Sequence, residues 1–359
     1  MPLTREQAVT ALRTVQDPEL FKDIITLNMV KDIQIGDDGT AVVAVELSSP
    51  QSPGRDAIER GVRGALSRAG ANDVRVTFST RGGPTASYIA NRGALPQVKN
   101  VIAVGAGKGG VGKSTIAVNL AVGLQRTGAR VGLMDGDIYG PSMPTMLAIK
   151  GQQPRLRGNK IMPFQVHGLH AITIGSLVEA DKPLIWRGPM AHGAFKQLLL
   201  DNTDWPDLDY LIVDLPPGTG DVPLTLCQLL PVTGAVVVAT PQQVALDDAV
   251  RAIRMFEQLG APILGMIENM SYFVDAVGAE HDIFGRGGTQ RTAQELGVPF
   301  IGTIPMFTEL RVNSDAGRPH ANFEGHPKLR LALEECVQRM VEEVTNRNAQ
   351  SAGPTLTIS

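Results

Sequence analysis

The chain has 359 residues, a length typical of two domains or of one large α/β domain with a smaller appended unit. It is 43% hydrophobic and 19% charged, and no apolar run reaches the roughly 18–20 residues of a membrane-spanning helix, which excludes a transmembrane protein. The 33 basic and 36 acidic residues give a net charge of −3, so we expect neither nucleic acid nor a membrane among the partners.

The amino terminus and the cysteine content restrict the compartment and the metal chemistry. The first residues have mixed charge and lack the apolar core of a secretory signal, so we expect a cytoplasmic protein. Cys227 and Cys336 are the only cysteines. This excludes a disulfide framework and any Cys-x-x-Cys metal pair.

Residues 1–91 are predicted to form a small α+β domain, followed by a linker over residues 92–97. Thr4 and Gln7 have the spacing of a capping box in front of an amphipathic helix. The later elements, read from apolar periodicity, are a hairpin around residues 36–39, a helix over 58–69 and a strand over 74–78.

Residues 98–346 alternate apolar strands with helical segments, which predicts a mainly parallel sheet with helices on both faces. The last helix is expected over about 327–344, and the polar tail of residues 347–359 is expected to be disordered. The strand candidates are Val101–Ala106, Arg130–Met134, Tyr210–Val213, Ala235–Thr240, Ile263–Ile267 and Phe300–Ile304.

A glycine-rich segment follows the first of these strands. It contains the dinucleotide fingerprint Gly105-x-Gly107-x-x-Gly110, but also the longer and complete phosphate loop Gly107-x-x-x-x-Gly112-Lys113-Ser114, which decides the interpretation. In this loop backbone N–H groups face phosphate oxygens, Lys113 meets the β- and γ-phosphates, and Ser114 ligates Mg²⁺. The predicted nucleotide-binding residues are Gly107, Lys108, Gly109, Gly110, Val111, Gly112, Lys113, Ser114 and Thr115.

Acidic residues end two of the predicted strands. Asp135 and Asp137 follow the second strand, and Asp214 follows the third. Ligands of open parallel sheets bind beyond the carboxyl ends of the strands, so these acids and the phosphate loop should meet in one crevice. Any one of them alone would equally suit a loop cap. As a set they favour nucleotide hydrolysis, in which Asp137 orients the attacking water and Asp214 holds the Mg²⁺ shell.

The loop, with its additional Lys108, resembles the deviant Walker A loop of the MinD/ParA/nitrogenase-iron-protein ATPases. Residues 17–20 and 28–30 resemble the small iron–sulfur assembly domain that precedes such an ATPase in many bacterial proteins. Further segments narrow the resemblance to the Mrp/ApbC family of iron–sulfur cluster carrier ATPases; these are residues 135–142 (DGDIYGPS), 186–190 (WRGPM), 214–221 (DLPPGTGD), 267–272 (IENMSY), 282–285 (DIFG) and 302–305 (GTIP).

The resemblance implies a slow ATPase that binds ATP and Mg²⁺, closes as an ATP-gated homodimer and serves iron–sulfur apo-proteins or assembly factors. It implies that Lys108 reaches the nucleotide of the partner subunit, that Asn269 reads the adenine and that residues 214–221 sense the γ-phosphate. The catalytic candidates are therefore Lys108, Lys113 and Asp137.

The chain departs from this family at its cysteines. Members that carry a cluster usually have Cys-Pro-x-Cys after Ser-Tyr-Phe-Val, whereas Asp275-Ala276-Val277-Gly278 stands here. In the small domain, Ser52 replaces the cysteine of the Thr-Pro-x-Cys-Pro segment. Because thiolates are the usual ligands of iron–sulfur clusters, the ligands of any cluster are unassigned, and we expect weak retention or none.

The other thiols and the histidines are poor substitutes. Cys227 and Cys336 lie in apolar segments and are predicted to be buried. His167, His170 and His281 are expected to be surface or hydrogen-bonded residues rather than ligands.

Two alternative functions follow. The missing cysteines favour a nucleotide-switched scaffold in cluster assembly that holds no cluster itself. The second alternative function is that of a positioning ATPase of the ParA/MinD type. The attached small domain, the lack of a basic DNA-binding surface and the lack of a terminal amphipathic membrane helix speak against it.

Overall fold

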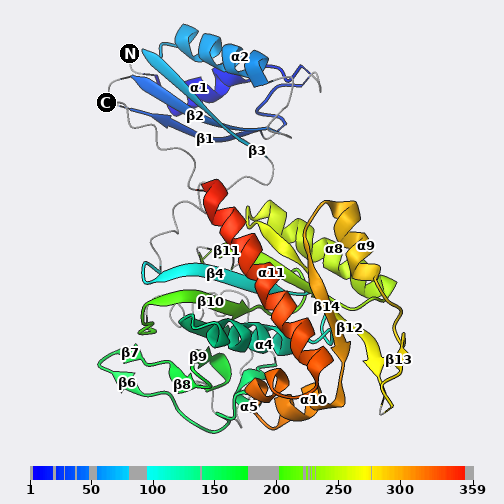
Figure 1. The fold of residues 1–359 in the computed structure, drawn as a ribbon. Coiled ribbons are helices and arrows are strands. Elements are labelled where there is room, and N and C mark those ends of the chain that lie inside the picture. Colours follow the sequence, from blue (N-terminus) through cyan, green and yellow to red (C-terminus); the bar gives the residue numbers. More distant parts are fainter. Residues whose placement is uncertain are drawn as a thin grey trace. The chain divides into compact units, whose positions relative to one another are not determined.

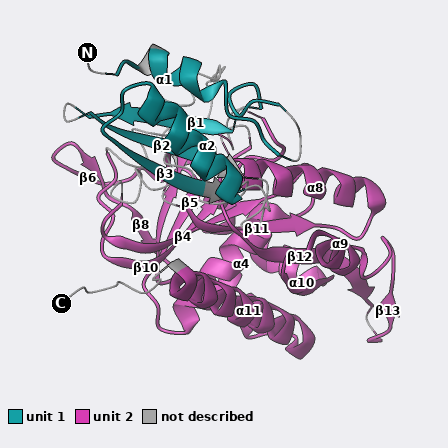
Figure 2. Cartoon of the chain, turned by 90° about the horizontal axis from the view of Figure 1, so that it is seen from above, with its two compact units in different colours: residues 1–85 teal, residues 86–359 magenta. Residues whose placement is uncertain are grey.

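The computed structural model describes residues 3–18, 22–27, 29–36, 39–47, 55–80, 95–137, 140–176, 202–220, 224, 227, 229–230, 232–275 and 277–351. Several residues named above lie outside these ranges: Ser52, the segments 186–190 and 352–359, residues 92–94 of the predicted linker, and positions 19–20, 28, 37–38, 138–139, 221 and 276. The chain divides into two compact units, Met1–Thr85 and Ala86–Ser359 (Figure 2).

The amino-terminal unit builds one core from two helices and a sheet of strand order β1-β2-β3. Thr4 and Gln7 form the predicted capping box at the start of α1. β1 and β2 make the predicted antiparallel hairpin, and β3 pairs with β2 in parallel. The elements are α1 (Arg5–Leu12), β1 (Val30–Ile35), β2 (Thr40–Leu47), α2 (Arg55–Arg68) and β3 (Asp73–Thr80).

The second unit is built on a sheet of strand order β13-β12-β11-β4-β10-β5-β9-β8, with β14 paired to β12 (Figure 1). All pairs are parallel except those of β8 and β13. The mainly parallel sheet is thus confirmed, while β8, β9 and β13 were not predicted. The strands are β4 (Val98–Gly105), β5 (Val131–Asp135), β8 (Phe164–Val166), β9 (Leu169–Thr173), β10 (Leu208–Asp214), β11 (Val232–Ala239), β12 (Ile263–Val274), β13 (Glu280–His281) and β14 (Phe300–Met306).

Helices cover both faces of this sheet. Ile102 and Val104 of β4 belong to the core that includes α4 and α11, whereas Val101 and Ala103 belong to the core that includes α8 and α9. Successive side chains of a strand point to opposite faces, so the two cores lie on opposite sides. The remaining elements are α4 (Lys113–Arg126), α5 (Met143–Met146), β6 (Leu156–Arg157), β7 (Lys160–Ile161), η2 (Ile174–Ser176), α8 (Gln243–Gln258), α9 (Gly288–Leu296), α10 (Thr308–Asp315), η4 (Pro319–Phe323) and α11 (Pro327–Ser351).

The last helix is longer than predicted. α11 extends to Ser351, so residues 347–351, expected in the disordered tail, are helical. The Asn348 side chain explains part of this extension, because its Nδ2 donates to Asn100 Oδ1 of β4 at 2.9 Å. Within the described ranges, no helix is both long enough and apolar enough to span a membrane.

Gly123 allows α4 to approach α11 and η4 closely. A Cβ added there would lie 2.5 Å from Val337 Cγ2 and 3.1 Å from Phe323 Cζ. We expect Gly123→Ala to lower the free energy of unfolding of this unit by about 1–3 kcal/mol, because overpacking outweighs the better helix propensity of alanine. Chemical denaturation measures the change. Gly64→Ala in α2 is the control: its Cβ would meet nothing within 4 Å, and we expect a gain of about 0.5–1 kcal/mol in its own unit. Equal stability of Gly123→Ala and wild type would contradict the close packing.

Candidate nucleotide-binding site

The glycine-rich loop joins β4 to the amino terminus of α4, and its glycines are required by conformation and by packing. Gly110 and Gly112 have φ values of +82° and +81°, which residues other than glycine rarely adopt. A Cβ at Gly107 would lie 2.0 Å from the backbone oxygen of Asp248 in α8. The loop therefore presents backbone N–H groups at a helix amino terminus, an arrangement that binds anions such as phosphate.

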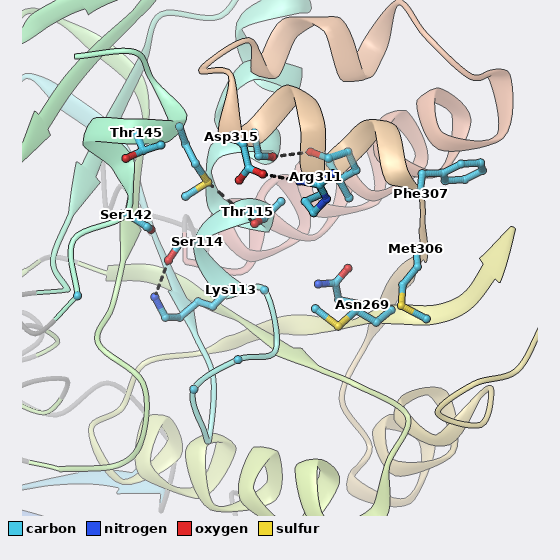
Figure 3. Close-up of a pocket in the computed structure, with 18 of the residues that line it drawn as sticks. Lys113, Ser114, Thr115, Ser142, Thr145, Asn269, Met306, Phe307, Arg311 and Asp315 are labelled. Atoms are coloured by element: carbon cyan, nitrogen blue, oxygen red, sulfur yellow. Dashed lines mark hydrogen bonds and ion pairs between the residues drawn. The ribbon is translucent and has the colours of Figure 1, made fainter. Parts of the chain in front are cut away.

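A buried ion pair lies next to this loop. Lys113 Nζ is 2.5 Å from Asp214 Oδ1 and 3.3 Å from Ser114 Oγ (Figure 3 shows Lys113 and Ser114). The two charged side chains are only 6% and 0% exposed. Burial raises the pKa of Asp214 above its ordinary value, while the Lys113 ammonium acts in the opposite direction. The second oxygen, Asp214 Oδ2, is buried and has no hydrogen-bond partner in the described part of the chain.

Asp135 and Asp137 have different surroundings. Asp135 lies opposite Asp214 in the parallel register of β5 and β10. Burial, and next the charge of Asp214, raise the pKa of Asp135 to about 7. Its oxygens accept hydrogen bonds from the Asp137 N–H at 3.1 Å and from Thr173 Oγ1 at 2.9 Å. Asp135 therefore holds the turn that carries Asp137, rather than facing a ligand itself.

A pocket of about 760 Å³ extends from the loop to the ends of β12 and β14 and to α10. This volume lies in the range of small-molecule and cofactor sites. Of the predicted residues, those that line the pocket are Lys108, Gly109, Gly110, Gly112, Lys113, Ser114, Thr115, Asp137 and Asn269. Gly107 packs on α8, Val111 is buried, and Asp214 reaches the pocket only through Lys113.

Asn269 contacts the phosphate loop itself. Its Nδ2 donates to the backbone oxygen of Val111 at 2.8 Å, and a Cβ at Gly112 would lie 2.2 Å from that nitrogen. The following residue, Met270, has a φ of +54°, which is uncommon outside glycine. Asn269 thus links the middle of β12 to the loop, and its role in reading adenine stays a prediction.

The part of the pocket formed by α10 was not predicted from the sequence. Arg311 and Asp315 of this helix form an ion pair at 2.7 Å (Figure 3). No local motif marks this helix, because it meets the loop only through the fold. The apolar side chains that line the pocket are Met146, Pro217, Met270, Phe273, Pro305, Met306, Phe307 and Leu310.

Asp275, Val277 and Gly278, the described residues of the segment that replaces the family's paired cysteines, lie in a turn between β12 and β13. The Asp275 carboxylate accepts hydrogen bonds from the N–H groups of Val277 at 3.0 Å and Ala279 at 2.8 Å, and bonds to His281 Nε2 at 2.8 Å. The bond to His281, followed by the backbone donors, lowers the pKa of Asp275. Gly278 has a φ of +86°. The Asp275 carboxylate therefore stabilises the turn by accepting hydrogen bonds from groups within it.

Both cysteines are buried, as predicted. Burial raises the pKa of each thiol, Cys227 and Cys336, to about 12. Cys336 Sγ lies 2.7 Å from the position of a Cβ at Gly302, so this thiol packs against β14. At neutral pH both groups are protonated and enclosed, whereas a metal ligand must be a thiolate.

The three histidines considered above differ in their surroundings. The ring centroid of His167 is 5.3 Å from that of His320, and burial lowers the pKa of His167 and of His170. His281 is bonded to Asp275. Among the residues that the structure describes, no group of three or more His, Cys, Asp or Glu side chains is arranged to hold a metal ion.

Comparison with family models assigns both units. A model described as the NUBPL iron-transfer P-loop NTPase, ParA, matches residues 97–344. A second model, described as an iron-sulfur cluster assembly protein, matches residues 5–78.

Relatives and solved structures agree with these models. Iron-sulfur cluster carrier proteins from Synechocystis and Deinococcus radiodurans are 45% and 49% identical, over 88% and 86% of this chain and 91% and 87% of their own. A nucleotide-binding protein from Archaeoglobus fulgidus, solved with ADP, is 35% identical with a TM-score of 0.57, over 65% of this chain and 92% of its own. The cell-division ATPase MinD of Pyrococcus furiosus shares the fold at 21% identity, with a TM-score of 0.52 over 68% and 99% of the two chains. The chain therefore belongs to the NUBPL-type iron-transfer P-loop NTPases, the family of the iron–sulfur cluster carrier proteins, and carries an iron–sulfur cluster assembly domain before its NTPase domain.

Proposed function

We propose that this protein is an ATP-binding and ATP-hydrolysing iron–sulfur cluster carrier or assembly protein. It works in the cytoplasm as an ATP-gated homodimer and serves iron–sulfur apo-proteins or assembly factors. The observation that carries the proposal is the pocket lined by the phosphate loop, by Asp137 and by a Lys113 that is ion-paired to buried Asp214. Relatives that are 45% and 49% identical are named iron-sulfur cluster carrier proteins, which supports an iron–sulfur cluster as the cargo.

The groups around Lys113 fit a magnesium ion. Asp214 Oδ2 is a buried carboxylate oxygen without a hydrogen-bond partner in the described ranges, and the Ser114 hydroxyl contacts the same lysine. Mg²⁺ prefers such oxygens and usually binds through one or two of them together with phosphates. Ser114 and Asp214 would hold the ion, which supplies charge neutralisation at the β- and γ-phosphates.

Hydrolysis requires that Lys113 exchange partners. Its ammonium group has three donors and is held by one carboxylate oxygen and one hydroxyl. A triphosphate offers several anionic oxygens, so Lys113 can turn from Asp214 to the terminal phosphates. A magnesium ion held by Ser114 and Asp214 would then supply the positive charge that Asp214 loses from Lys113. Asp137 orients the attacking water from a turn that Asp135 fixes to the end of β5.

Lys113→Ala is expected to abolish productive ATP binding, with a loss of affinity of about a hundredfold, because a charge-assisted hydrogen bond contributes up to about 3 kcal/mol. Titration calorimetry measures the loss. The control is Lys99→Ala, which removes an exposed lysine paired with Asp209 at 2.8 Å, at the amino end of β4. Because Lys113→Ala also leaves Asp214 as an unpaired buried charge, Lys113→Met combined with Asp214→Asn serves as a second variant. Unchanged affinity and turnover would remove the phosphate-loop assignment.

Lys108 is the residue proposed to act across the dimer. It lines the pocket and is half-buried. We expect Lys108→Ala to retain most of the ATP affinity of each monomer but to lose ATP-dependent dimerisation and hydrolysis. Sedimentation and phosphate release are measured together on the same sample. Full ATPase activity from a strictly monomeric protein would contradict this assignment.

The turn at Asp275 favours a second candidate, a nucleotide-switched scaffold in cluster assembly that keeps no cluster. Its carboxylate is already occupied by three donors, and both thiols of the chain are enclosed. The ParA/MinD-type positioning function has no comparable support, since the likeness to MinD, at 21% identity, extends to the fold alone.

Cluster retention distinguishes the two candidates. We expect wild-type protein, reconstituted anaerobically and desalted, to keep far less than one cluster per dimer, because thiolate ligands are missing. Iron and acid-labile sulfide are measured, and Cys227→Ser with Cys336→Ser should change neither. A stable, stoichiometric cluster that survives this double substitution would show that other ligands suffice.

Restoring the thiols tests the same segment from the opposite direction. Asp275→Cys with Gly278→Cys should increase retention if a dimer brings two such turns together. Both substitutions disturb the turn, since Asp275 caps it and Gly278 has a φ of +86°. Asp275→Ser with Gly278→Ser produces the same disturbance without thiols, so the difference between the pairs isolates the thiolates. Equal retention by the two pairs would exclude a cluster site at this turn.

A further inference from the structure

Three asparagine side chains form a continuous hydrogen-bonded chain across the NTPase unit. Asn313 Nδ2 of α10 donates to Asn322 Oδ1 of η4 at 3.0 Å, and Asn322 Nδ2 donates to Asn119 Oδ1 of α4 at 2.9 Å. Asn119 Nδ2 donates in turn to the backbone oxygen of Thr115 at 2.8 Å. Asn322 and Asn119 thus each accept one hydrogen bond through the side-chain oxygen and donate one through the side-chain nitrogen.

Burial makes this chain costly to break. Asn322 is fully buried and Asn119 is 1% exposed. A buried amide that loses its partner pays its full desolvation cost, and hydrogen bonds in series polarise one another. Apolar side chains could fill this space without the penalty of a broken hydrogen bond. The asparagine chain instead favours one fixed spacing of α10, η4 and α4, because any other spacing would break one of its hydrogen bonds.

The chain joins two helices, α4 and α10, that both line the nucleotide pocket. Thr115 belongs to the first turn of α4 and lines the pocket beside Ser114. Asn313 belongs to α10, whose Arg311 and Asp315 line the same pocket (Figure 3). Lys113 and the loop N–H groups account for a triphosphate, so the apolar side chains near α10 remain for the nucleoside.

We propose that the chain Asn313–Asn322–Asn119 positions α10 relative to the phosphate loop, so that affinity for the nucleoside, but not for the phosphates, depends on it. The proposal rests on the proposed function, in that the ligand is a nucleoside triphosphate. The three asparagines touch no ligand and are positioning residues.

The test compares two ligands on the same full-length protein, magnesium ATP and magnesium tripolyphosphate. Asn322→Ala is expected to weaken ATP binding by about five- to tenfold, while the Kd for tripolyphosphate changes by less than about twofold. Asn313→Ala, at the half-buried outer end, should give the same split and serves if Asn322→Ala does not fold. The matched control is Asn348→Ala, which breaks another amide–amide bond, to Asn100 at 2.9 Å, at the amino end of β4. It should change neither affinity.

The outcomes separate this inference from the proposed function. An unchanged ATP affinity in both chain variants overturns the positioning role. An equal loss of ATP and tripolyphosphate affinity overturns it too, because a general loss of folded protein moves both ligands together. Wild-type protein that binds no ATP overturns the proposed function, and the inference with it.

Discussion

The buried ion pair between Lys113 and Asp214 is the interaction on which the nucleotide pocket depends. Burial disfavours the charged form of each side chain, and the ion pair offsets part of this penalty. Lys113 begins α4 and Asp214 ends β10, so the pair also ties the phosphate loop to the neighbouring strand. The pair therefore positions the Lys113 side chain next to the phosphate loop.

The parallel sheet determines which carboxylates join this pair. β4, β10 and β5 are neighbours, and Asp135 and Asp214 are in register at their carboxyl ends. Burial and the charge of Asp214 raise the pKa of Asp135 from 3.8 to about 7. The folded protein thus binds this proton more tightly than the unfolded chain does, and the contribution of Asp135 to stability falls as the pH rises from about 4 to 7. The same carboxylate accepts the hydrogen bond that orients the turn of Asp137, so this loss of stability accompanies the positioning of Asp137.

The sequence predicted those parts of the fold and the site that depend on local patterns. The phosphate loop and the acids at the ends of β5 and β10 are recognisable because loop, strand and helix follow one another directly. β8 and β9 were missed, since polar residues such as Gln165 and His170 interrupt their apolar pattern. The α10 wall and the asparagine chain could not be predicted, because Asn119 and Asn322 are 203 positions apart and only the fold brings them together.

The turn at Asp275 shows why the loss of two cysteines changes the chemistry of this segment without disrupting its fold. A carboxylate that accepts two backbone N–H bonds and contacts His281 stabilises the hairpin by itself. A metal bound there would have to displace those donors. The chain contains only two cysteines, and both thiols have a pKa of about 12, so thiolates from this chain become available only if its core opens. This enclosure favours the proposal that the thiolates of a transferred cluster belong to the protein with which this chain exchanges it.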